Sequence, residues 1–136
     1  MKNMPTIKKI SLFILIIGYI AAGINHFRIP AFYTGIIPAY LPYHVFINYA
    51  SGTVEILLGL LLIFPQTRKL AAWGIVMLLI AFLPVHIDML GGHLRAGTIV
   101  VTPVWAWVRL FFQPVLIWWA WWYTRDNTAQ VYYKAH

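Results

Sequence analysis

The chain has 136 residues, of which 62% are hydrophobic and 10% are charged. Soluble domains are about half apolar and about a quarter charged, so this composition indicates an integral membrane protein with one transmembrane domain. The net charge of +7 comes from basic residues dispersed at the ends of apolar segments, which favours a lipid bilayer and argues against nucleic acid, and the lack of cysteine excludes thiolate chemistry by this chain alone.

A first membrane-spanning helix is predicted near residues 7–26. Two lysines precede its apolar core, a pattern that a signal peptide shares. Three more apolar segments follow, and cleavage would remove the polar pair Asn25-His26 from the end of its helix. We therefore expect this helix to be retained.

Residues 27–45 form a segment of a different kind. Prolines at positions 30, 38 and 42 are incompatible with a long helix, and the tyrosines and isoleucines argue against a solvated loop. Tyrosine prefers the headgroup layer of a membrane. We expect an interfacial segment, lying along the membrane surface or folded partly back as a cap on the helices.

Three further spans are predicted near residues 46–64, 70–90 and 103–124. Pro84 leaves the carbonyl four residues earlier without its helical partner, which predicts a bend in the third span. Thr102 followed by Pro103 is typical of an N-cap and a first helical residue. The fold class is therefore all-α: an integral membrane four-helix bundle with an interfacial segment between its first two helices.

The distribution of basic residues predicts the orientation. Four spans place both termini on one side, and one side then carries Arg28 and Arg95. Seven basic residues share the side of the termini: Lys2, Lys8, Lys9, Arg68, Lys69, Arg125 and Lys134. Because cytoplasmic loops are enriched in lysine and arginine, we expect a multi-pass protein of the cell (inner) membrane with both termini in the cytoplasm.

Glu55 is an ionisable residue near the middle of the second span. A charge at the centre of a lipid-exposed helix costs about 2.5–3.5 kcal/mol, so we expect Glu55 to face the other helices. Arg109 in the fourth span needs a counter-ion, and Glu55 is its preferred partner. This pair is either a structural link between helices or part of a functional site.

The other polar side chains of the spans fall in the same outer half. Four helices that contribute polar groups at one level favour a small-molecule pocket, with Glu55 and His86 as candidate proton carriers. The predicted ligand-binding residues are Asn25, His26, Glu55, Asp88, Arg109 and Gln113. His86 and Asp88 are separated by about 200° around a helix and should point in different directions. The alternatives are headgroup contacts for the histidines and solvation for Asp88.

Three motifs resemble the DoxX-like family of small four-helix membrane proteins over about residues 10–124. They are Asn25-His26-Phe27, Glu55-Ile-Leu-Leu-Gly59 and Thr67-Arg-Lys-Leu-Ala-Ala72. The resemblance implies that His26 and Glu55 are motif positions, and that the chain is associated with quinone-linked oxidation of sulfur compounds or with thiol-oxidation complexes. The absence of cysteine departs from a thiol-exchange role of its own.

Three functions remain open. The first is an accessory subunit of a redox or respiratory system that binds a quinone-like molecule. Electrons would come from a membrane or extracytoplasmic partner, because the sequence contains no flavin, metal or iron–sulfur motif. The chain would then take part in catalysis only as an accessory subunit without a redox centre of its own. The second is a non-catalytic assembly protein, including a homo-oligomer, with a structural Glu55–Arg109 pair. The third is a b-type cytochrome with His26 and His86 as haem ligands and no other metal site.

Overall fold

The computed structural model describes residues 4–91, 95–96, 99–100 and 102–125, and this part of the chain is almost entirely helical, as predicted. The helices are α1 Thr6–Arg28, α2 Pro30–Thr34, α3 His44–Ile63, α4 Arg68–Ala81, α5 Leu83–Met89 and α6 Pro103–Thr124. Two short strands, β1 Arg95–Ala96 and β2 Ile99–Val100, pair in antiparallel fashion.

Within the described residues, three helical segments are long and apolar enough to cross a membrane. They are α1, α3 and the combined α4–α5 segment Arg68–Met89. Helix α6 has 22 residues and is not among these three segments.

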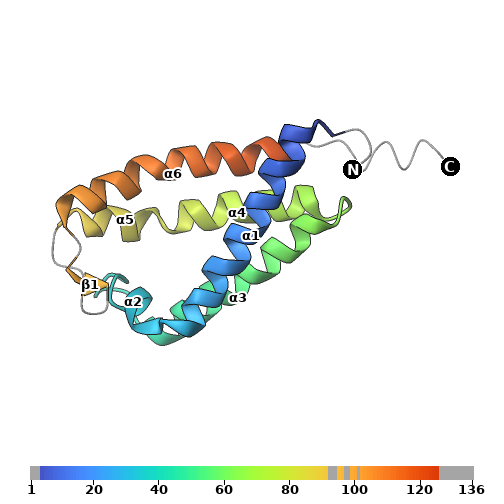
Figure 1. Ribbon diagram of the computed structural model, residues 1–136. Helices are drawn as coiled ribbons and strands as arrows, with labels where there is room; N and C mark the ends of the chain where they lie inside the picture. The colour runs from blue at the N-terminus through green and yellow to red at the C-terminus, as the bar shows by residue number, and fades with distance from the viewer. Residues whose placement is uncertain (1–3, 92–94, 97–98, 101, 126–136) are drawn as a thin grey trace.

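The helices form two arms that diverge from one end (Figure 1). Helix α1 packs on α3 in one arm, and α6 packs on α4 and α5 in the other. The arms meet where α1 begins and α6 ends, which we call the vertex, and α2 and β1 lie at the opposite, wide end. The segment before α3 folds back there, and its Ile36 and Ile37 are buried.

Glycines allow α1 and α3 to approach closely. A Cβ atom added to Gly23 would lie 2.6 Å from the carbonyl oxygen of Gly52, and one added to Gly52 would lie 2.5 Å from Cβ of His26. Small residues at such a seam are a common device of membrane helix packing. The contact places the last turn of α1, with His26, directly against the first half of α3.

Polar contacts join α1 to α6 at the vertex. Trp119 Nε1 and Tyr123 Oη each donate a hydrogen bond of 2.7 Å to Ser11 Oγ. Tyr123 Oη also lies 3.2 Å from the carbonyl oxygen of Lys8. The expectation that the consequential polar groups gather only at the outer end of the helices is therefore corrected, because this network lies at the other end.

Two predicted local features are confirmed. Helix α4 ends at Ala81 and α5 begins at Leu83, so the helical segment breaks beside Pro84. At the start of α6, the side chain of Thr102 accepts a hydrogen bond of 3.5 Å from the backbone N–H of Trp105, and Pro103 is the first helical residue.

Candidate functional site

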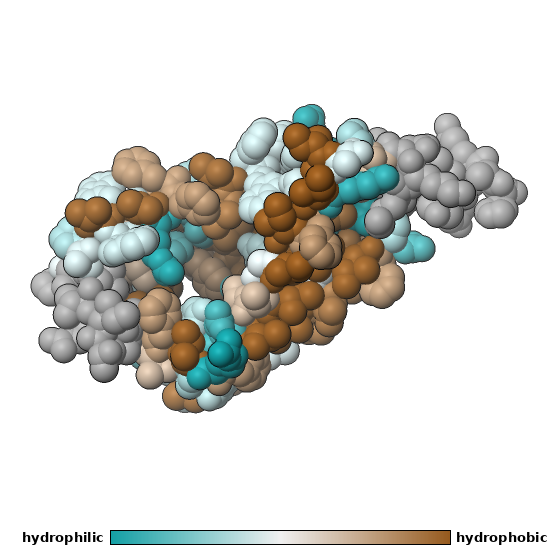
Figure 2. Space-filling view, viewed as in Figure 1, coloured by the Kyte–Doolittle hydropathy of each residue, from teal (hydrophilic) through white to brown (hydrophobic). Residues whose placement is uncertain are grey.

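A cavity of about 680 Å³ lies between the two arms. Figure 2 shows a recess at the centre of the face that α1 and α6 flank. Most of the lining side chains are aliphatic or aromatic, such as Leu15, Phe82 and Leu116. The polar and charged groups in the wall are therefore few, and each can orient a ligand.

The cavity brings together most of the predicted site residues. His26, Glu55, Arg109 and Gln113 line it, and so does the candidate proton carrier His86. Asn25 and Asp88 are not among its described lining residues. Asn25 is about 100° around the helix from His26, and Asp88 is about 200° from His86. Because both histidines line the cavity, the side chains of Asn25 and Asp88 point in other directions.

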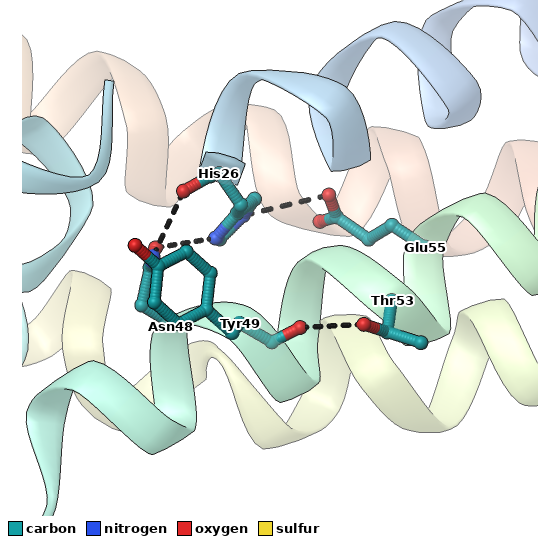
Figure 3. A network of polar contacts seen from close by, with 5 residues as sticks. All are labelled: His26, Asn48, Tyr49, Thr53 and Glu55. Atoms are coloured by element: carbon teal, nitrogen blue, oxygen red, sulfur yellow. Dashed lines mark hydrogen bonds and ion pairs between the residues drawn. The ribbon is translucent and has the colours of Figure 1, made fainter. Parts of the chain in front are cut away.

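Asn48 holds His26 through two hydrogen bonds (Figure 3). Its amide nitrogen donates to the carbonyl oxygen of His26 at 2.9 Å, and its amide oxygen lies 2.8 Å from His26 Nδ1. Because the amide oxygen can only accept, Nδ1 of His26 must carry the hydrogen. Asn48 was not among the predicted site residues, although an amide seven residues before Glu55 lies on the same face of a helix.

The other ring nitrogen of His26 faces Glu55. Nε2 lies 3.5 Å from Glu55 Oε2, and the two side chains are only 8% and 9% exposed. With the hydrogen on Nδ1, a neutral ring would present a lone pair to the carboxylate. Attraction therefore requires one more proton, held as an imidazolium–carboxylate pair or as a carboxylic acid that donates to Nε2. Both forms are neutral overall, which lowers the cost of burial.

The partner of Glu55 differs from the expected one. No ion pair within the described residues joins Glu55 to Arg109, whereas His26 lies within ion-pair distance. Helix α6 packs on α4 and α5, so Arg109 lies in the other arm, while α1 contacts α3 directly. The predicted Glu55–Arg109 pair is therefore corrected to a His26–Glu55 pair, with Arg109 elsewhere in the wall of the same cavity.

Tyr33 of α2 covers the histidine. Its ring stacks on that of His26 with 3.7 Å between ring centroids. Burial raises the pKa of Tyr33, the charge of Glu55 raises it further, and the charge of Arg109 lowers it. The phenol therefore keeps its proton and remains a hydrogen-bond donor beside the cavity.

Two buried polar atoms of the lining residues are left without a hydrogen bond. Within the described part of the chain, neither Glu55 Oε2 nor His86 Nδ1 has a hydrogen-bond partner. Gln113, in contrast, donates from Nε2 to the carbonyl oxygen of Leu79 at 2.6 Å. Glu55 Oε2 still faces His26 Nε2, whereas a buried polar atom without any partner costs about 1–3 kcal/mol, so a ligand that hydrogen-bonds to His86 Nδ1 would be favoured.

The arrangement does not fit a bis-histidine haem site. Nδ1 of His26 is engaged by Asn48 and Nε2 faces Glu55, so iron ligation would displace one of these partners. The described residues also contain no group of three or more histidine, aspartate or glutamate side chains that could hold a metal ion.

The comparisons with known proteins add a family and no activity. A family model described as "Domain of unknown function (DUF8561)" matches residues 15–124. This match extends from the first half of α1 to the last residue of α6. No curated protein and no solved structure matches the chain.

Proposed function

We propose that this chain, which belongs to the family described as domain of unknown function DUF8561, is a multi-pass membrane protein that binds a small, largely apolar molecule with polar oxygens. A quinone-like ring is the ligand class that fits best. In this proposal the chain is an accessory subunit of a redox system, in keeping with its resemblance to the DoxX-like family, and a partner protein supplies the electrons.

The proposed membrane arrangement has four spans, with α6 as the fourth. A helix of 22 residues is about 33 Å long, which is enough to cross the hydrocarbon core. The first turn of α1 and the last turn of α6 lie at the vertex (Figure 1), where Lys8, Lys9 and Arg125 also lie. This basic end is placed in the cytoplasm, and the proline- and aromatic-rich segment with α2 lies at the outer interface.

One observation carries the ligand proposal: a buried histidine–glutamate pair that needs a shared proton borders a cavity with mostly apolar walls. A volume of about 680 Å³ falls within the roughly 300–1,000 Å³ of drug-sized sites. A bound quinone would accept hydrogen bonds at its ring oxygens, and His26–Glu55 can give or take one proton there. Arg109 and Tyr33 add two donors from other elements of the wall.

The variant Glu55→Gln tests this proposal. Glutamine keeps the size and polarity of the side chain but cannot exchange a proton. We expect wild-type protein in lipid nanodiscs to bind a short-chain benzoquinone, and the variant to bind it about tenfold or more weakly, a loss of about 1.4 kcal/mol. Isothermal titration of both proteins measures the two affinities.

Thr53→Val is the matched control. Thr53 lies half a turn from Glu55 on α3, is exposed, and its hydroxyl donates a hydrogen bond of 2.8 Å to the carbonyl oxygen of Tyr49 (Figure 3). We expect it to bind the ring as the wild type does. Equal affinity of the Glu55→Gln variant and the wild type would contradict a binding role for Glu55.

A second function is favoured by the glycine seam. The His26–Glu55 pair lies beside the close approach of Gly23 and Gly52, where a buried pair can fix the register of two helices. In this alternative the chain is a non-catalytic assembly protein. It predicts that Glu55→Gln lowers the thermal stability or abolishes partner capture, and that native mass spectrometry finds no small molecule bound to the wild type.

A further inference from the structure

The cavity is elongated along the helices. Its lining residues on α1 run from Ile14 to His26, which corresponds to about 18 Å of helix. Those on α6 run from Arg109 to Trp119, or about 15 Å. A ring that contacts His26 and Glu55 would therefore occupy only part of the space.

The two ends of the cavity differ in chemistry. His26, Arg109 and His86 contribute polar groups toward the wide end, where Tyr33 also lies. Toward the vertex the lining residues of α1 and α6 are mostly apolar, and they include Leu15, Gly18 and Leu116. A molecule with one polar and one hydrocarbon end matches this gradient better than a compact polar metabolite does.

The exposed part of the wall lies on α1 and α6. Ile14 of α1 is 54% exposed and Phe112 of α6 is 56% exposed, although both line the cavity. The lining residues Asn48 and Glu55 of α3 are buried instead. Helices α1 and α6 are joined by the Ser11 hydrogen bonds at the vertex and diverge from there (Figure 1), and the recess of Figure 2 lies between them.

Gly18 leaves this opening unfilled. A Cβ atom added to Gly18 would meet no atom within 4 Å, whereas one added to Gly23 or Gly52 would collide with the facing helix. Gly18 lies in the middle of an apolar helix, so the opening faces the hydrocarbon layer in the proposed membrane arrangement.

We propose that the ligand is an elongated lipid-soluble molecule that enters from the bilayer between α1 and α6. Its uncharged polar end lies at the His26–Glu55 pair, and its hydrocarbon tail runs past Gly18 toward Leu116. The inference rests on the proposed ligand function of the same cavity. The polar end that meets the His26–Glu55 pair is uncharged because this pair is neutral overall, and Arg109 elsewhere in the wall can donate a hydrogen bond to it.

The test uses Gly18→Phe and two probes. One probe is a benzoquinone with a ten-carbon alkyl chain, and the other is the same ring without the chain. The Cβ atom of the new side chain meets no protein atom within 4 Å, so the phenyl group extends from there into the opening. We expect equilibrium binding of the tailed probe to weaken about tenfold or more in nanodiscs, a loss of about 1.4 kcal/mol, while binding of the tail-free ring is unchanged.

Ile17→Phe is the matched control. Ile17 is adjacent to Gly18, is 49% exposed and does not line the cavity, so the same phenyl group should leave both affinities unchanged. Thermal unfolding of each variant checks that it folds. If Gly18→Phe does not fold, Leu116→Trp narrows the same channel from α6 and should show the same selective loss.

The outcomes separate the two proposals. Unchanged binding of the tailed probe by folded Gly18→Phe and Leu116→Trp would overturn the tail channel and leave the ring site intact. Equal loss of both probes would place the ring itself at Gly18 and overturn the orientation. Failure of the wild type to bind either probe would overturn the proposed function and this inference together.

Discussion

At the scale of single residues, the sequence predicted several residues that line the cavity, but it did not predict which of them pairs with Glu55. His26 and Glu55 were predicted from their place in apolar segments, and both line the cavity. Glu55 was predicted to pair with Arg109 because the position of a residue within its span indicates its depth in the membrane. The sequence does not indicate which helices pack against each other. The glycine contact between α1 and α3 decides that choice, and its effect is visible only in three dimensions.

Asn48 is expected to be the residue that orients His26. Replacing Asn48 by leucine removes two hydrogen bonds. Nδ1–H of the buried His26 loses its acceptor, and the carbonyl oxygen of His26 loses its donor. We predict a loss of about 1–3 kcal/mol in unfolding free energy, because buried groups lose their hydrogen bonds. Thermal or denaturant unfolding in detergent measures it. The exposed Thr53→Val should change stability by less than about 0.5 kcal/mol, and an equally small effect of Asn48→Leu would refute this role.

At the scale of helices, the predicted segments and the observed helices nearly coincide, because long apolar runs and proline positions determine where a helix can form. The turn between α3 and α4 has a structural role that the charge count did not indicate. Arg68 was counted among the basic residues on the side of the termini, and its side chain is fully buried. Its Nε donates to the carbonyl oxygen of Leu62 at 3.0 Å, and Nη2 donates to that of Ile63 at 3.3 Å. Arginine thus caps the C-terminus of α3, where carbonyls lack helical partners.

Arg68→Met should therefore destabilise the protein by about 1.5–3 kcal/mol or more, since hydrogen bonds from a charged group are lost at a helix end. Lys69→Met is a close control, because Lys69 is the exposed next residue and its replacement removes the same charge from the same turn. Unfolding of both variants separates capping from the effect of charge on membrane topology. Similar stabilities of the two variants would show that Arg68 acts only as a topological charge.

At the scale of the whole molecule, the sequence indicates how many apolar segments exist but not how they pair. A four-helix bundle was expected, and the structure has two arms that diverge from the vertex (Figure 1). The polar network of Ser11, Trp119 and Tyr123 closes one end, while the bulky segment with α2 occupies the other. The cavity between the arms could not be inferred from hydropathy, because apolar residues that line it have the same hydropathy as residues of a packed core or of a lipid-facing surface.

The number of spans can be tested with single cysteines, for which the chain offers a clean background because it has none of its own. Tyr40 and Gln66 are exposed positions on either side of α3, and Arg125 follows α6. With four spans, a membrane-impermeant maleimide added to intact cells should label Tyr40→Cys and spare Gln66→Cys and Arg125→Cys, and all three should react after permeabilisation. Labelling of Arg125→Cys in intact cells, with Gln66→Cys still protected, would mean that α6 does not cross. The cavity wall contributed by α6 would then have to be reconsidered as a surface outside the bilayer.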